Sequence, residues 1–210
     1  MIAHVVREAA GEPRGTIVLL HGRGADEHDL LPLLGVLDPH KRYRGITLGG
    51  PLTMPPGGKH WYAVHRVGWP DPATFSPTYE ELTGVLDDEL GLDWSTTVIG
   101  GFSQGGVMSY AVGLGPGRPV PAGILAMSCF LPRFDDGTWE PDFAGRPQLP
   151  VAHVHGASDP VIGIEFGRDA HERVTAAGLP MLYEEFPGGH NVDPRLLPVL
   201  ADWLAQRLSF

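Results

Sequence analysis

The chain has 210 residues, enough to bury one sizeable core, and its 42% hydrophobic and 19% charged residues are ordinary for a globular protein. Its formal net charge of −10 disfavours nucleic acid and anionic membrane surfaces as partners. A single cysteine excludes an internal disulfide framework, and no apolar run approaches the roughly 20 residues of a membrane span. Residues 1–10 lack the apolar core of a signal peptide. We therefore expect one cytoplasmic domain over residues 1–210, without stable membrane insertion, and the sequence leaves a homodimer open.

Short apolar runs alternate with amphipathic segments along the chain. The run Thr16–Leu20 is continuously apolar, which is typical of a strand buried on both faces. This alternation predicts a mostly parallel sheet of about seven strands with helices on both faces. The other expected strands span residues 3–8, 45–48, 95–99, 122–127, 151–155 and 181–186.

Helices are expected between these strands. Thr78 and Glu81 can form a capping box directly after Pro77, which predicts a helix over residues 78–90. The stretch before it, residues 49–77, is rich in Pro, Gly and aromatic residues and lacks periodicity, which is typical of a functional loop. Pro198 cannot donate a backbone hydrogen bond inside the closing helix, so the expected start of that helix shifts downstream. The other expected helices span residues 30–37, 107–114, 161–177 and 194–208.

The sequence around Ser103 has the form of a nucleophile elbow, a serine at the turn between a strand and a helix. Gly101 and Gly105 stand two residues away on either side, where such a cramped turn admits only small residues, and Gly106 lets the helix approach the sheet. The G-x-S-x-G pattern alone also fits a glycine-rich turn with an ordinary serine. The strand before it and the helix after it favour the elbow.

Further chemical groups follow the carboxyl ends of other predicted strands, where open α/β sheets bind their ligands. Asp159 and His190 each follow a late strand, and the glycine-rich turn His21–Gly24 follows an early one. The order Ser, Asp, His is that of α/β-hydrolases. A serine hydroxyl needs a base to take its proton and a carboxylate to orient that base. Ser103, His190 and Asp159 are therefore the predicted catalytic residues.

The backbone N–H groups of Arg23 and Gln104 are the predicted donors of an oxyanion hole. Arg23 lies in the glycine-rich turn, and Gln104 starts the helix after the nucleophile. Asp135 and Asp136 are rival acids, but no strand directly precedes them. The alternative role of Asp159 is to cap the helix that follows it.

Ten histidines require a metal site to be considered. His153 and His155 alternate on a strand and point the same way, and His21 ends another strand. No H-E-x-x-H or C-x-x-C spacing supports zinc, so we predict neither a metal nor another cofactor. His155, directly before a glycine, fits better as a residue that positions its loop.

Several motifs are more specific than G-x-S-x-G: Gly-Phe-Ser-Gln-Gly-Gly over 101–106, Leu-His-Gly-Arg-Gly-Ala-Asp over 20–26, and Pro-Gly-Gly-His over 187–190. With them the chain resembles the phospholipase/carboxylesterase family of serine hydrolases, which includes the acyl-protein thioesterases. The resemblance implies an α/β-hydrolase fold without a large cap domain, and hydrolysis of carboxylic esters or thioesters. It also implies the triad and oxyanion donors assigned above. Departures from the family pattern are a short stretch after Tyr62, Arg23 in place of a smaller residue, and Cys129 in place of glycine.

We expect an esterase that cleaves a small-molecule ester of small to medium acyl length through an acyl-enzyme. Met54, Trp61, Phe102 and Cys129 are candidates for an apolar acyl pocket, with plain core packing as the alternative. The acidic charge and the short loop favour small esters over a thioesterase or lysophospholipase on long acyl chains. A non-catalytic receptor with the same fold is the third hypothesis, although such proteins usually lose a triad residue and none is missing here.

Overall fold

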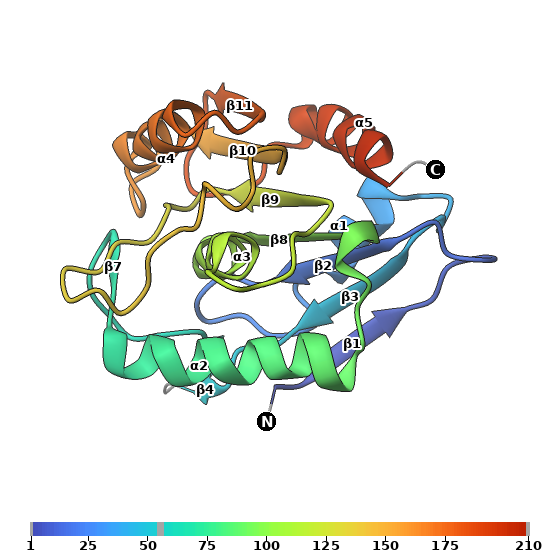
Figure 1. Ribbon diagram of the computed structural model, residues 1–210. Helices are drawn as coiled ribbons and strands as arrows, with labels where there is room; N and C mark the ends of the chain where they lie inside the picture. The colour runs from blue at the N-terminus through green and yellow to red at the C-terminus, as the bar shows by residue number, and fades with distance from the viewer. Residues whose placement is uncertain (1, 54–56, 209–210) are drawn as a thin grey trace.

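The structure is a computed structural model that describes residues 2–53 and 57–208, so Met54 lies outside the described residues. Within those residues a seven-stranded sheet in the order β1-β3-β2-β8-β9-β10-β11 runs through the middle of the molecule (Figure 1). Its neighbouring strands are parallel except for the antiparallel pair β1 and β3. The strands are β1 (His4–Arg7), β2 (Thr16–Leu20), β3 (Arg44–Leu48), β8 (Thr97–Phe102), β9 (Gly123–Met127), β10 (Val151–Gly156) and β11 (Met181–Phe186).

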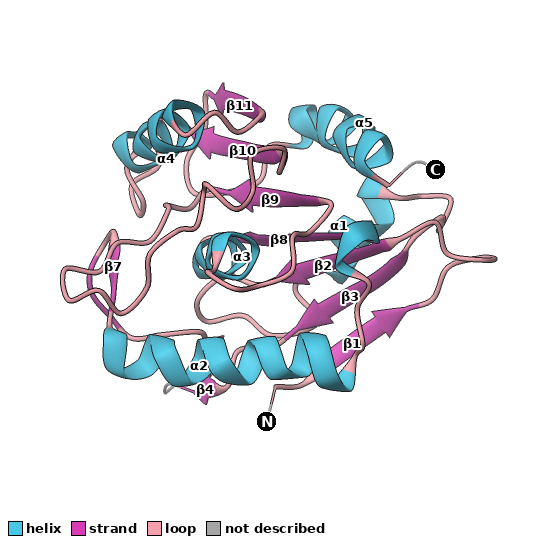
Figure 2. Cartoon of the chain, in the orientation of Figure 1, coloured by secondary structure: helices cyan, strands magenta, loops and turns pink. Residues whose placement is uncertain are grey.

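Helices cover both faces of the sheet, because its inner strands are apolar on both sides (Figure 2). In β2, Val18 and Leu20 pack into the core beneath α2, α3 and α4, whereas Ile17 and Leu19 pack into the core beneath α1 and α5. This arrangement confirms the predicted fold class, and the described residues contain no large cap domain. The helices are α1 (Leu31–Leu37), α2 (Pro72–Gly84), α3 (Gln104–Leu114), α4 (Ile164–Ala176) and α5 (Leu197–Arg207).

The predicted capping box at Thr78 and Glu81 is wrong, because both residues lie inside α2. The helix begins at Pro72, and its N-cap is Asp71, whose carboxylate accepts a hydrogen bond of 3.1 Å from the Thr74 amide. An aspartate followed by proline supplies both an N-cap acceptor and a first residue that needs no N–H partner. The helix then continues into a π-helical turn over Val85–Glu89.

Pro77 lies within α2 instead of ending the loop before it. A proline there removes one backbone hydrogen bond, and the burial of Phe75 and Leu82 on the same helix offsets that loss. The long loop predicted over residues 49–77 is correspondingly shorter. It contains the short strand pairs β4 (Leu52–Thr53) with β5 (Lys59–His60) and β6 (Val64–Arg66) with β7 (Trp69–Pro70).

Two later helices start after the residues predicted for them. Helix α4 begins at Ile164, because the amides of Val161 and Ile162 donate to the Asp159 carboxylate instead of opening the helix. Helix α5 begins at Leu197 behind a 3-10 turn, so the shift expected from Pro198 is confirmed. None of the described helices combines the length and apolar character that crossing a bilayer requires.

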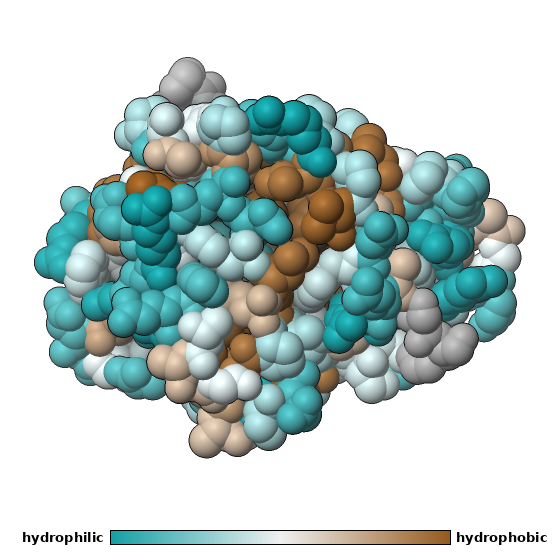
Figure 3. All heavy atoms as spheres, turned by 90° about the horizontal axis from the view of Figure 1, so that it is seen from above, coloured by the Kyte–Doolittle hydropathy of each residue, from teal (hydrophilic) through white to brown (hydrophobic). Residues whose placement is uncertain are grey.

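The last strand, β11, forms one edge of the sheet beside α4 and α5. Seen from above, this side of the molecule carries a band of apolar residues among charged ones (Figure 3). Leu182 of β11, Leu196 before α5 and Leu197 at the start of α5 are partly buried and pack onto the core. Because β11 pairs with β10 alone among the described strands, the loop after β11 starts from a strand that is hydrogen-bonded on one side only.

Candidate active site

Ser103 stands at the turn between β8 and α3, in a backbone conformation that side chains rarely adopt (φ 54°, ψ −121°). Gly105 makes this turn sterically feasible, because a Cβ there would lie 1.9 Å from the Leu20 carbonyl oxygen. Gly106 faces Cys129, whose Sγ would lie 2.6 Å from an added Cβ. A Cβ on Gly101 would lie 2.4 Å from the Gly105 carbonyl carbon, so the predicted need for small residues at Gly101 and Gly105 is confirmed. Helix α3 approaches the sheet at Gly106 as expected.

Ser103, His190 and Asp159 come together at the carboxyl ends of β8, β10 and β11. His190 Nε2 lies 2.9 Å from Ser103 Oγ, and its Nδ1 lies 2.7 Å from Asp159 Oδ2. A carboxylate can only accept, so Nδ1 carries the proton and Nε2 is left to accept from the serine hydroxyl. Ser103 and Asp159 are each 7% exposed, so this chain of hydrogen bonds lies largely out of water.

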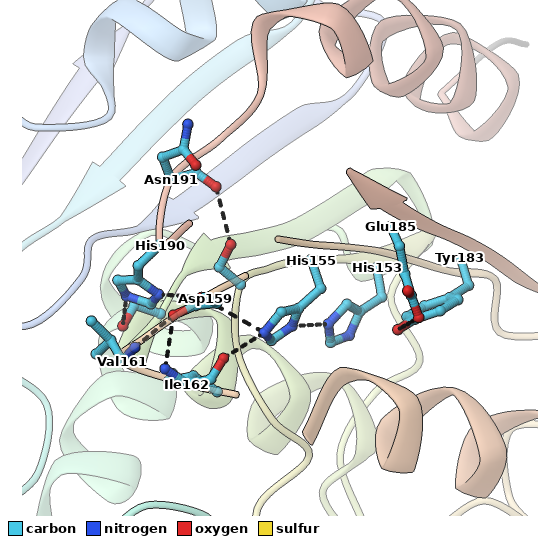
Figure 4. Close-up of polar contacts among 11 residues, drawn as sticks. His153, His155, Asp159, Val161, Ile162, Tyr183, Glu185, His190 and Asn191 are labelled. Carbon is cyan, nitrogen blue, oxygen red and sulfur yellow. Dashed lines mark hydrogen bonds and ion pairs between the residues drawn. The ribbon is translucent and has the colours of Figure 1, made fainter. Parts of the chain in front are cut away.

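Helix α4 has Gly163 as its N-cap, with no side-chain hydrogen bond, so the alternative role of Asp159 as a cap of that helix is wrong. The Asp159 carboxylate instead binds the turn before the helix. Its Oδ1 accepts from the amides of Val161 and Ile162 at 2.8 and 2.9 Å, while Oδ2 faces His190 (Figure 4). Asp135 and Asp136 are exposed and bond elsewhere, to the Trp69 indole N–H and to Thr138 respectively. Neither rival acid contacts the histidine.

The turn after β2 is held by the ring of His21, which is 1% exposed. The Gly50 amide donates to His21 Nε2 at 2.9 Å, so Nδ1 carries the proton and donates to the Gly22 carbonyl at 2.6 Å. The Gly22 carbonyl and the Arg23 N–H belong to one planar trans peptide and point in opposite directions. The His21 contact therefore orients the peptide whose N–H is the predicted oxyanion donor.

Burial lowers the pKa of His21, opposed by its hydrogen bond to Gly22. The neutral ring can accept from Gly50 and donate to Gly22 at once, which the imidazolium cannot. The turn is fastened further to β5, where the Gly24 amide donates to the Lys59 carbonyl at 2.8 Å.

Sequence reasoning missed the side chain of Gln104, which joins the elbow to the segment after β5. Its Oε1 accepts from the Trp61 amide at 3.1 Å and its Nε2 donates to the Tyr62 carbonyl at 2.8 Å. The Trp61 indole in turn donates to the His21 carbonyl at 2.8 Å. Trp61 thus links the His21–Gly24 turn to the elbow, and no local sequence pattern signals this role.

Ser128 is a second residue that sequence reasoning missed. It follows β9 with a φ of 47°, and its hydroxyl donates to the Asn191 carbonyl at 3.0 Å. Because Asn191 is next to His190, this bond fixes the loop that carries the histidine (Figure 4).

Two of the residues predicted to line an acyl pocket lie in the core instead. Trp61 and Cys129 are both 0% exposed, and burial raises the pKa of the Cys129 thiol. Trp61 is occupied by its two hydrogen bonds, and Cys129 packs against α3. Phe102 is partly exposed, and its ring centroid lies 4.8 Å from that of His190, so it borders the site.

The histidines considered as metal ligands do not converge. His153 and His155 bond to each other at 3.2 Å, whereas His21 bonds to Gly22 and Gly50 in the turn after β2. Across residues 2–53 and 57–208, no group of three His, Cys, Asp or Glu side chains could hold a metal ion.

The chain matches the family described as Phospholipase/Carboxylesterase over residues 2–208. It belongs to this family. Members and structural neighbours are carboxylesterases and thioesterases, so the chain is a hydrolase that acts on esters, as predicted.

Known proteins of similar sequence and fold cover nearly the whole chain. Acyl-protein thioesterase 1 of Neurospora crassa is 25% identical, over 95% of this chain and 89% of its own length. Acyl-protein thioesterase 1 of Gibberella zeae is 26% identical, over 99% and 96%. The crystal structure of the Bacillus cereus carboxylesterase has a TM-score of 0.83 at 19% identity and covers 99% of this chain and 95% of its own, which supports the shared fold.

Proposed function

We propose that this esterase hydrolyses small to medium acyl esters through an acyl-enzyme on Ser103. The observation that carries the proposal is the continuous hydrogen-bond chain from Ser103 Oγ through His190 to Asp159, with steps of 2.9 and 2.7 Å. Nucleophile, base and acid with these contacts form the constellation that serine hydrolases use.

In the first half-reaction, Ser103 Oγ attacks the acyl carbonyl as its proton passes to His190 Nε2. Asp159 stabilises the imidazolium through Nδ1 without taking its proton. The oxyanion of the tetrahedral intermediate accepts from the amides of Gln104 and Arg23. His190 then protonates the departing alkoxide, which leaves as the alcohol.

In the second half-reaction, water attacks the acyl group on Ser103 while His190 takes one of its protons. The second tetrahedral intermediate collapses, the acid is released, and the proton returns to the serine oxygen. The sum is ester plus water giving acid plus alcohol, and these steps need no metal or other cofactor.

Two observations support a short acyl group. Trp61 and Cys129, which would extend an apolar channel beneath the nucleophile, have no exposed surface. The tip of the β6–β7 hairpin also packs down onto α4, where a Cβ on Gly68 would lie 2.7 Å from the Phe166 ring. The second candidate is a thioesterase on long acyl chains, and the similarity of the chain to fungal acyl-protein thioesterases supports the thioesterase part of it. The single cysteine, buried and unpaired, supports a cytoplasmic location.

The test is a chain-length series of p-nitrophenyl esters and matched acyl thioesters, with wild type and Ser103→Ala. We expect highest kcat/KM for acetyl to hexanoyl esters, and loss of turnover in Ser103→Ala. A preference for palmitoyl thioesters would replace the small-ester proposal by the second candidate. Full turnover in Ser103→Ala would overturn the triad, and a fluorophosphonate probe that fails to label wild type would support the receptor hypothesis.

A further inference from the structure

A buried chain of hydrogen bonds lies behind the acid, on the side away from the nucleophile (Figure 4). Tyr110 Oη lies 2.8 Å from His153 Nδ1, His153 Nε2 lies 3.2 Å from His155 Nδ1, and His155 Nε2 lies 2.8 Å from the Ile162 carbonyl oxygen. Tyr110, His153 and His155 are each 0% exposed. Burying two adjacent imidazoles is costly, so a role for them is expected, and the proposed mechanism uses neither.

Only one arrangement of protons satisfies all three contacts when both rings are neutral. The Ile162 carbonyl can only accept, so His155 carries its proton on Nε2 and accepts on Nδ1. His153 must then donate from Nε2 and accept on Nδ1 from the Tyr110 hydroxyl. The chain therefore runs one way, from Tyr110 to Ile162.

The end of this chain is the turn that holds the acid. His155 fixes the Ile162 carbonyl, and the Ile162 amide donates to Asp159 Oδ1 at 2.9 Å beside the Val161 amide at 2.8 Å. His155 Nε2 is itself 3.7 Å from Asp159 Oδ2, the oxygen that contacts His190. A charged His155 would compete with the His190 imidazolium for that one carboxylate, whereas a neutral ring anchored on Ile162 does not.

The titratable groups around these rings come from β11, from α4 and from the loop after β11, where the charge of His190 opposes protonation of His155. On β11, Glu185 raises the pKa of His155, and its carboxylate accepts from the Tyr183 hydroxyl beside the His153 ring. On α4, His171 opposes protonation of His153, and Gly167 brings the helix onto the His155 ring, where an added Cβ would lie 2.7 Å from Nδ1.

Burial is the largest influence on both rings. It lowers the pKa of His155 in spite of the Ile162 carbonyl and Asp159, and it lowers the pKa of His153 to about 3. The surroundings therefore favour the neutral forms that the hydrogen-bond directions require.

We propose that His155 and His153 are positioning residues that anchor the Asp159–Ile162 turn as a neutral pair and so reserve Asp159 Oδ2 for His190. The proposal rests on the function proposed above, because it assigns a role in holding the acid of that triad. Neither histidine contacts the substrate in this role.

The first test compares His155→Leu with His155→Gln, which keeps a donor near the position of Nε2. Because small misplacements of catalytic groups cost on the order of 100-fold in rate, we expect His155→Leu to lower kcat for p-nitrophenyl butyrate about 10- to 100-fold with KM within about twofold. His155→Gln should recover kcat to within about threefold of wild type, and His40→Leu, at an exposed histidine, should match wild type. Wild-type kcat in His155→Leu, or an equal loss in His155→Gln, would overturn the proposal.

The second test needs no variant and guards against a His155→Leu protein that does not fold. Nitrogen-15 NMR of histidine-labelled wild type should show His153 and His155 as neutral Nε2–H tautomers from pH 5 to 8. A His155 ring that titrates in this range or carries its proton on Nδ1 would overturn the proposal. If wild type instead lacks esterase turnover while these tautomers are present, the proposed function fails and the hydrogen-bond chain stands.

Discussion

Truncation of the Gln104 side chain should destabilise the fold strongly for so small a change. Gln104→Ala deletes both hydrogen bonds to the segment after β5, where the Trp61 amide and the Tyr62 carbonyl are its partners at 3.1 and 2.8 Å. Gln104, Trp61 and Tyr62 are all buried, at 4%, 0% and 2% exposure. Water therefore has little access to the two backbone groups left behind.

The expected cost follows from the two unpaired groups. A buried donor or acceptor that loses its partner costs about 1–3 kcal/mol, so Gln104→Ala should lower the free energy of unfolding by about 2–6 kcal/mol. Activity should fall less than in Ser103→Ala, because alanine keeps the backbone N–H predicted to bind the oxyanion. Gln104→Pro removes that N–H and should abolish turnover even if the protein folds.

Urea denaturation followed by tryptophan fluorescence measures the loss directly. Gln148→Ala is the matched control, because that glutamine is exposed, and it should leave stability within about 0.5 kcal/mol of wild type. Equal stability of Gln104→Ala and Gln148→Ala would refute the reasoning, since the hydrogen bonds of Gln104 to Trp61 and Tyr62 would then contribute nothing to stability.

Three further predictions concern the acid, the elbow and the buried histidines. Asp159→Asn should lower kcat about 10³- to 10⁴-fold in the ester assay, while Asp136→Asn should not; the reverse would reassign the acid. Gly105→Ala should lower the melting temperature markedly, because its Cβ would lie 1.9 Å from a backbone oxygen, whereas Gly84→Ala has open space and should not. His153 stays neutral with a pKa of about 3 while the unfolded chain takes up a proton below about 6.5, so its stabilising effect is complete above 6.5 and is lost as pH falls. From pH 6 to 5 the free energy of unfolding should drop by about 1.2 kcal/mol for His153 alone, and a urea midpoint unchanged between pH 7 and 5 would contradict this.

The sheet and the proposed triad residues could be predicted from the sequence because both are marked by local sequence patterns. Each inner strand is a short apolar run. Ser103 directly follows such a strand, and Asp159 and His190 come within about four residues of the ends of β10 and β11. Parallel strands bring their carboxyl ends to one edge, so the meeting of these residues follows from the strand order. The start of α2 was missed because Pro77 was interpreted as a boundary, although Asp71 and Pro72 are an equally good local start signal.

The supporting contacts of the site were not predictable in this way. Gln104 and Trp61 are 43 residues apart, and Ser128 and Asn191 are 63 apart. Such pairs depend on how loops from different strands lie beside each other, which no single window of sequence records. The same holds for His155, whose importance comes from the direction of its hydrogen bonds and from its burial.

The place of β11 at the edge of the sheet has a consequence for how activity is acquired during folding. The proposed nucleophile, Ser103, follows the central strand of the sheet, but its proposed base, His190, follows the last strand, 87 residues further along the chain. An intermediate with β2, β8 and β9 formed and β11 undocked would hold a correctly turned but inert serine. Contacts of such long sequence separation form slowly. Recovery of esterase turnover during refolding should therefore lag behind burial of the central core and report on the docking of this final strand.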